Sequence, residues 1–259
     1  MFENRYPIFN SGRLLKIEML EELRDFSREF FDAQFKGYSD GIISGCDLEV
    51  SDNYIKISKG IIKYHGVIYL LKKDSRLEYT CSNKLTILKV KFLPEMQDSD
   101  FRMNSTEMSL TENLELGENE IEICRFKLRV GAKLRINHTD FTDLSTEYDT
   151  VNTIYAPYAA YGDSSLNPDI LRRFGLELLG CNLNEPWDIS FAMMCVQSKE
   201  AIQKEILISY LAYKLSIENR EYSNEDLYYY LLDVLSSAKD GAGSHGRRGS
   251  GRFKKILID

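Results

Sequence analysis

The chain has 259 residues, of which 33 are Lys or Arg and 40 are Asp or Glu, so its formal net charge is -7. Hydrophobic residues make up 43% and charged residues 28%, a balance typical of globular proteins that excludes a wholly disordered chain. No apolar run approaches the roughly 20 residues that span a bilayer, and the first residues lack a secretory signal pattern, so we expect neither membrane insertion nor secretion.

Residues 1–37 are predicted to form an N-terminal segment and a long amphipathic helix over 16–35. Apolar residues at Leu20, Leu23, Phe26 and Phe30 follow helical spacing, and charged residues occupy most other positions. A face with this much aromatic surface should be buried, either on the β-rich region that follows or on a copy of itself. Gly37 follows the last periodic residue and is predicted to cap the helix.

Residues 38–136 predict an antiparallel β-sandwich-like domain. Turn signals at 59–60 and 65–66 flank two short apolar runs that read as successive hairpin strands. The parity of the apolar residues changes between Ile123 and Cys124, which predicts a β-bulge at that point. Residues 94–120 are polar and acidic, and they predict a long loop or an excursion between strands.

The rest of the chain predicts a connection followed by helices, so the fold class is α+β. Residues 137–166 are irregular and are interpreted as a linker. Residues 167–240 predict a bundle of four helices, because Asn, Ser, Asp and Pro start signals precede runs of helical periodicity. The third of these helices is predicted to be capped by Ser198.

Residues 241–259 are predicted to be an extended Gly- and Arg-rich arm, with five Lys or Arg against one Asp. This composition is typical of nucleic-acid-binding tails, and nucleic-acid binding is the alternative function. The acidic body would repel a phosphate backbone, so docking of the arm on another protein is favoured. Contacts in the arm are predicted at Arg247, Arg248, Arg252, Phe253, Lys254 and Ile256.

No pattern of catalytic or metal-binding residues is found. The five cysteines are far apart in sequence and read as small apolar residues, and the three histidines lack partners at metal-ligand spacing. The Gly-x-Gly-x-x-Gly match at 241–246 follows a helix, whereas a dinucleotide site needs a strand before it and a helix after it. We therefore expect no enzyme activity, no metal and no cofactor.

Three segments together resemble a known class of proteins. Residues 9–20 read Phe-Asn-Ser-Gly-Arg-Leu-Leu-Lys-Ile-Glu-Met-Leu, and residues 38–48 read Tyr-Ser-Asp-Gly-Ile-Ile-Ser-Gly-Cys-Asp-Leu. Residues 55–64 read Ile-Lys-Ile-Ser-Lys-Gly-Ile-Ile-Lys-Tyr, and a His-Gly turn follows. This order resembles baseplate and tail proteins of prophages and phage-tail-like bacteriocins. It is also distantly similar to the start of the type VI secretion baseplate protein TssK.

The resemblance covers residues 9–71 and implies a structural role. It implies a baseplate or tail-fibre adaptor in a contractile tail or tail-like particle, assembled in the bacterial cytoplasm through contacts between proteins. It also implies a homo-oligomer, with a trimer favoured, and other baseplate or tail-fibre subunits as partners. The helix residues Leu20, Leu23, Phe26 and Phe30 are the predicted contacts outside the arm.

Overall fold

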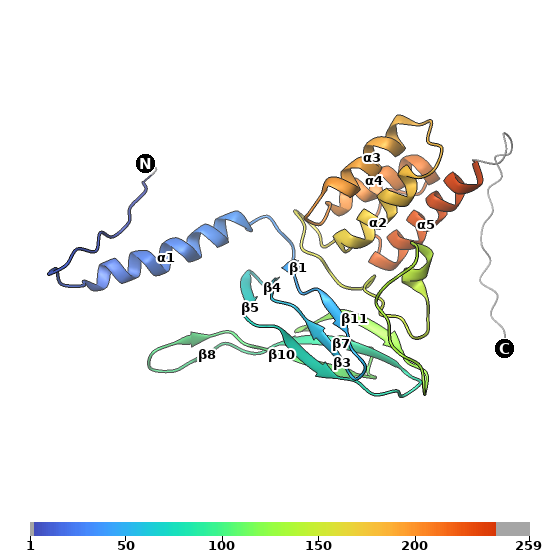
Figure 1. The fold of residues 1–259 in the computed structure, drawn as a ribbon. Helices are drawn as coiled ribbons and strands as arrows, with labels where there is room; N and C mark the ends of the chain where they lie inside the picture. Colours follow the sequence, from blue (N-terminus) through green and yellow to red (C-terminus); the bar gives the residue numbers. More distant parts are fainter. Residues whose placement is uncertain (1–2, 242–259) are drawn as a thin grey trace.

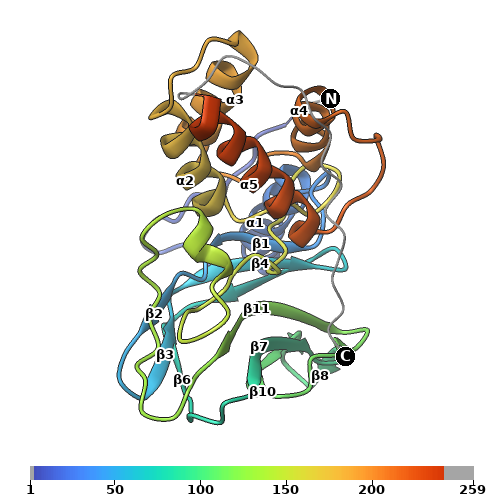
Figure 2. The ribbon, with the colours of Figure 1, turned by 90° about the vertical axis from the view of Figure 1, so that its right-hand side faces the viewer.

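The structure, a computed structural model, describes residues 3–241. Within this range it contains five α-helices, one short 3-10 helix and several small antiparallel sheets, so the predicted α+β class is confirmed. Four of the helices gather on one side of the molecule and the sheets on the other, while the N-terminal helix projects from the body (Figure 1). Figure 2 shows the same division from a second direction.

The β-rich part contains three three-stranded antiparallel sheets. Their strand orders are β1-β4-β5, β10-β7-β11 and β2-β3-β6. The strands are β1 (Gly41–Gly45), β2 (Leu48–Val50), β3 (Tyr54–Ile57), β4 (Gly60–Tyr64), β5 (Val67–Leu71), β6 (Ser75–Glu78), β7 (Leu85–Phe92), β10 (Thr106–Thr111) and β11 (Glu120–Lys127). The predicted hairpin over β4 and β5 is confirmed, with Tyr64 paired to Val67.

The predicted β-bulge is present in β11. Its register against β7 shifts between Glu122 and Cys124, so Ile123 is an additional residue in that strand. The shift lets Ile121, Ile123 and Cys124 all lie in one core, although they do not alternate in sequence.

Residues 94–120 were predicted to be a long loop or an excursion between strands, and the structure shows the excursion, between β7 and β11. They contain a small hairpin of β8 (Met96–Gln97) and β9 (Arg102–Met103), followed by β10, which pairs with β7 over six residues. The apolar signal of β10 comes only from Met108 and Leu110, because Thr, Ser and Glu fill its other positions. As an edge strand it needs only one apolar face.

The helical part closely follows the sequence pattern. Its helices are α2 (Pro168–Leu179), α3 (Pro186–Gln197), α4 (Lys204–Leu215) and α5 (Asn224–Gly241). Asn167 caps α2, and its side chain accepts a hydrogen bond from the amide of Asp169 at 2.8 Å. The predicted cap at Ser198 is wrong: α4 begins six residues later, after Gln203, and Ser198 instead ends α3.

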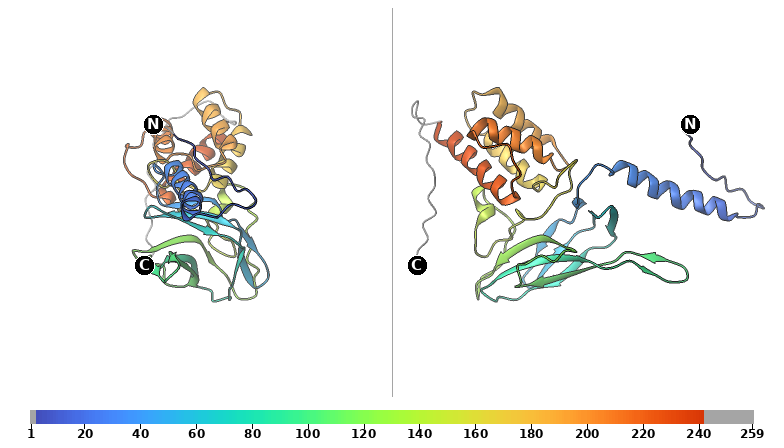
Figure 3. Two further views of the ribbon diagram at one scale, coloured as in Figure 1. Left: turned by 90° about the vertical axis from the view of Figure 1, so that its left-hand side faces the viewer. Right: turned by 180° about the vertical axis from the view of Figure 1, so that it is seen from behind.

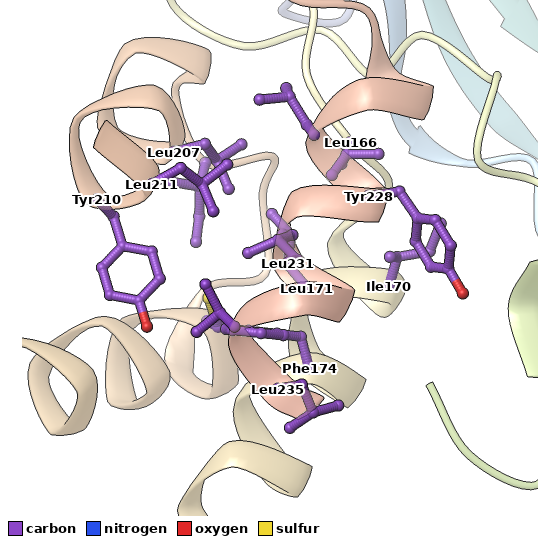
Figure 4. Close-up of a cluster of buried hydrophobic side chains, with 14 of the residues drawn as sticks. Leu166, Ile170, Leu171, Phe174, Leu207, Tyr210, Leu211, Tyr228, Leu231 and Leu235 are labelled. Carbon is purple, nitrogen blue, oxygen red and sulfur yellow. The ribbon is translucent and has the colours of Figure 1, made fainter. Parts of the chain in front are cut away.

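The four helices enclose one apolar core (Figure 4). Phe174 of α2, Leu211 of α4 and Leu231 of α5 are all fully buried in it. The rings of Phe191 and Tyr210 stack with centroids 3.9 Å apart, and the Tyr210 hydroxyl donates to Asp188 at 2.8 Å. The hydrogen bond satisfies a polar group that would otherwise be buried without a partner.

The connection over 137–166 contains little regular structure beyond the 3-10 helix η1 (Thr142–Ser145), yet it supplies buried side chains to both cores. Phe141 and Ile154 belong to the helical core, whereas Val151 and Ala156 belong to the β core. The two parts of the body are thus packed against a shared segment of chain.

Asp143 holds the start of this connection in place. Its contacts lead us to expect that the folded state loses stability in acid. Its carboxylate accepts two hydrogen bonds from Arg135 at 2.6 and 2.5 Å and one each from the Thr139 amide and the Thr146 hydroxyl. These donors, with Arg135 contributing most, hold the pKa of Asp143 well below its usual range.

A carboxyl group whose pKa is lowered by folding stabilises the folded state above its unfolded pKa of about 4, and this contribution is lost as the pH falls. We therefore expect Asp143→Asn to lower the free energy of unfolding by about 2 kcal/mol at pH 7. Urea unfolding between pH 7 and pH 3 should show a weaker pH dependence for the variant than for the wild type. Equal pH dependence of the two proteins would contradict this assignment.

Candidate assembly surface

The N-terminal helix α1 (Ile17–Gln34) has an apolar face that the chain itself does not cover. The predicted helix is confirmed, but none of its residues is buried. Leu20, Leu23, Phe26 and Phe30 are each 47% to 58% exposed, which is unusual for large apolar side chains grouped on one helix. The helix does not pack its apolar face on the β-rich region, so the prediction that this region buries the face is wrong.

Figure 1 shows why the face stays uncovered: α1 points away from the body. Seen from behind, the helix again extends free of both the sheets and the bundle (Figure 3). The segment before it adds further exposed apolar side chains, which include Ile8, Phe9, Leu14 and Leu15. Most of the stability of an amphipathic helix in a protein comes from packing of its apolar face, so a partner that covers this face would stabilise α1.

Lys63 of β4 holds the C-terminal end of α1. Its ammonium group donates to the backbone carbonyls of Phe35 at 2.7 Å and Tyr38 at 2.5 Å, and the residue is 8% exposed. A buried cation beside the free carbonyls at a helix C-terminus is favourable both as a hydrogen-bond donor and as a charge. Gly37 does not cap the helix, since α1 ends at Gln34 with the Phe35 amide bonded to Phe31.

Two further contacts join the same end of the helix to the rest of the body. The Tyr38 hydroxyl donates to Glu200, in the loop between α3 and α4, at 2.9 Å. Gly37 lies against the ring of Tyr161 in the connection, where a Cβ atom would approach that ring to 2.3 Å. Residues 35–38, which we call the base of α1, therefore contact the sheets, the connection and the helical part.

We expect Lys63→Met to loosen the base of α1. Methionine keeps most of the apolar stem but leaves the two carbonyls without their charged donor, a loss of about 1.5–3 kcal/mol. Hydrogen exchange of the backbone amides of residues 31–38 should become faster, while exchange in the helical core should not change. Lys36→Met is the matched control, because Lys36 lies in the same segment and is exposed. Equal effects of both substitutions would contradict the role of Lys63.

Two other groups of exposed apolar side chains lie on the body. The β8–β9 hairpin extends from the same side as α1 and exposes Met96, Phe101 and Met103 (Figure 1). Helix α3 is apolar on its outer face as well as its inner face. Its exposed Trp187 lies with its ring centroid 5.4 Å from that of Tyr213. Both groups resemble parts of interfaces, where Trp, Tyr and Met are enriched.

The other predicted contacts lie outside the described residues. These are Arg247, Arg248, Arg252, Phe253, Lys254 and Ile256, and the arm over 242–259 to which they belong remains a prediction.

The cysteines lie where the sequence suggested, in apolar surroundings for the most part. Cys46, Cys124 and Cys195 are buried, and burial raises the pKa of Cys46 to about 11 and that of Cys195 to about 12. These two thiols are therefore protonated at neutral pH, a state that disfavours nucleophilic chemistry.

A cavity of about 550 Å³ opens between the β-rich part and α2. Its lining mixes both signs of charge, with Asp47 and Asp169 beside Arg172 and Arg173. Burial lowers the pKa of His138, which also lines the cavity, and its ring nitrogen lies 2.9 Å from the Val151 carbonyl. The absence of enzyme activity stays a prediction.

Over residues 3–241, no group of His, Cys, Asp and Glu side chains has the arrangement of a metal site. Within the same part of the chain, no helix combines the length and hydropathy required to cross a membrane.

Comparison with known proteins gives matches among solved structures only. No family profile and no curated protein matches the chain. A crystal structure of TssK is similar over 93% of this chain and 73% of that chain, with a TM-score of 0.44 and 9% identity. A chain of the type VI secretion TssK-TssF-TssG baseplate subcomplex has a TM-score of 0.43 and 7% identity over 93% of this chain and 100% of that chain.

A chain of the baseplate complex from the type VI secretion system is also similar, with a TM-score of 0.38 and 9% identity over 92% of this chain and 100% of that chain.

Proposed function

We propose that this protein is a non-enzymatic structural subunit of a baseplate in a contractile tail or injection particle. In this role it joins neighbouring subunits, acting as an adaptor between the baseplate and the tail fibres. Its partners are other baseplate or tail-fibre subunits and further copies of the chain. The particle is assembled in the bacterial cytoplasm.

One observation carries the proposal: the apolar face of α1 has no cover within the described chain. Leu23, Phe26 and Phe30 are each about half exposed, and full burial of such side chains contributes about 1.5–3 kcal/mol each. A monomeric protein rarely presents so much apolar surface on a projecting element, whereas a subunit of an assembly buries it against a neighbour. The resemblance of residues 9–71 to tail and baseplate proteins supports the same role.

The anchoring of α1 also fits a subunit that must present this surface in one direction. Lys63 and Tyr161 contact the base of α1, and Tyr38 within the base contacts Glu200. These contacts fix the direction in which the helix leaves the body. Preorganisation of this kind lowers the entropy cost of binding.

Deletion of the gene in a strain that makes contractile particles tests the proposal. Electron microscopy of the deletion strain should show no intact, contractile, fibre-bearing particles, and expression of the wild-type chain from a plasmid should restore them. Intact particles in the deletion strain would contradict the proposal.

A further inference from the structure

We infer that α1 binds the α1 helix of a second copy of this chain, with the two helices parallel and in register. The inference rests on the proposed function and deepens it by naming the partner of the exposed helix. It starts from the spacing of five residues, which we call the core positions: Met19, Leu23, Phe26, Phe30 and Ala33.

The core positions are separated by four, three, four and three residues. This alternation has a mean period of 3.5 residues, which is the repeat of a left-handed coiled coil. In a straight helix such a repeat forms a nearly axial stripe that a second helix can cover along its whole length. The three central core positions, Leu23, Phe26 and Phe30, are 47% to 58% exposed, so the described chain leaves about half of each side chain uncovered.

The charges beside the core positions favour a parallel pair. In a parallel coiled coil the residues just before Leu23 and Phe30 each lie next to the residue five places later on the other helix. Glu22 then meets Ser27 of the second copy, and Glu29 meets Gln34. No like charges are brought together by either pairing.

An antiparallel pair brings the same acidic residues together. If Leu23 packs opposite Phe26 of the second copy, Glu22 lies beside Glu29 of that copy, and the reverse contact occurs at the other end. Like charges in such flanking positions are destabilising, and they are a common determinant of orientation in coiled coils. The parallel orientation is therefore favoured because it avoids the contacts between Glu22 and Glu29.

The anchored base agrees with this orientation. Lys63 holds the C-terminal end of α1 on β4, so two parallel helices place both bodies at the same end of the pair. The β8–β9 hairpin extends on the side of α1 in each body (Figure 3). The exposed Met96 and Phe101 of the hairpin then lie on the side of the body that faces the helix pair.

Cysteine cross-linking of the full-length chain tests both the partner and the orientation. Phe26→Cys places a thiol at a core position, where parallel helices bring the two copies of residue 26 close enough for a disulfide. Arg28→Cys is the matched control, since residue 28 lies on the outer side of the helix. Under mild oxidation, Phe26→Cys should form a covalent dimer at least about tenfold faster than Arg28→Cys, because the pair holds the thiols at a high effective concentration.

The native cysteines set the background, since Cys81 is exposed. The wild-type chain is therefore oxidised in parallel, and only dimer formed above its level counts. A mixture of Leu23→Cys and Phe26→Cys chains separates the orientations: a mixed disulfide faster than the Phe26→Cys homodimer would show antiparallel helices and overturn the inference.

Sedimentation of the wild-type chain should give a mass of at least two copies, and Leu23→Gln, Phe26→Gln and Phe30→Gln together should give one copy. A wild-type monomer without Phe26→Cys cross-linking would overturn the inference. If the deletion strain still lacked particles in that case, the proposed function would stand and α1 would bind another subunit. If the deletion strain made intact particles and cross-linking occurred as expected, the proposed function would be wrong, whereas the pairing of the α1 helices would stand.

Discussion

A chain carrying Leu23→Gln, Phe26→Gln and Phe30→Gln together will fold but will not restore particles to the deletion strain. The three side chains are about half exposed on α1, so burial of the exposed half against a neighbour contributes about 3 kcal/mol in sum. A loss of this size weakens binding by about a hundredfold or more. Electron microscopy and co-sedimentation of the variant with particle fractions measure the effect.

The control for this variant is Glu21→Gln, Arg24→Gln and Arg28→Gln, which introduces the same residue type on the charged face. The control should restore particles. The body of both variants should melt at the same temperature as the wild-type body, because no residue of α1 is buried in the chain. Loss of the partner should lower the stability of α1 alone. Equal complementation by the two variants would show that the apolar face of α1 is not an assembly contact.

Phe141→Ala will destabilise the body strongly, although Phe141 lies outside any α-helix or strand. Its ring is fully buried, and the ring centroid lies 4.9 Å from that of Tyr228 and 5.6 Å from that of Phe174. Removing a buried Phe side chain costs about 3–5 kcal/mol. Thermal unfolding followed by circular dichroism should show a melting temperature lower by about 10 °C.

Phe101→Ala is the matched control, since Phe101 is 68% exposed in the β8–β9 hairpin. It should leave the melting temperature nearly unchanged. A shift for Phe101→Ala as large as that for Phe141→Ala would mean that the connection does not stabilise the helical core.

Most helices of this chain could be predicted because their start signals and periodicity agree. Asn167 before Pro168 marks the start of α2, and Ser223 before Asn224 marks that of α5. The bulge in β11 was also predictable, since a change of apolar parity within one strand has few other structural explanations. Local patterns of this kind are specific because they depend on neighbouring residues alone.

Other features depend on distant residues and could not be read in this way. The periodicity of α1 shows that one face is apolar, but it cannot show whether the same chain covers that face. Lys63 looks like an ordinary strand residue, and only the fold brings it to the carbonyls of Phe35 and Tyr38. The one available signal was a lysine within an apolar run, between Ile62 and Tyr64.

Ser198 shows a different cause of error. It has the residue type of a helix cap and precedes a helical pattern, yet its hydroxyl donates to the Glu200 carbonyl at 2.8 Å in a loop. Residue type alone could not separate a cap from a turn, because serine serves in both. The outer face of α3 could have been recognised, since its one charged residue, Asp188, is buried and its exposed positions include Trp187 and Met194.

The base of α1 gives the projecting helix the mechanics of a lever. Strand β4 holds it through Lys63, the connection abuts it at Tyr161, and the loop after α3 reaches it through Glu200. A load applied to the free end of the helix is therefore divided among three elements, and one of these, the connection, is itself embedded in both cores. A change in the direction of α1 would therefore have to alter contacts with all three elements.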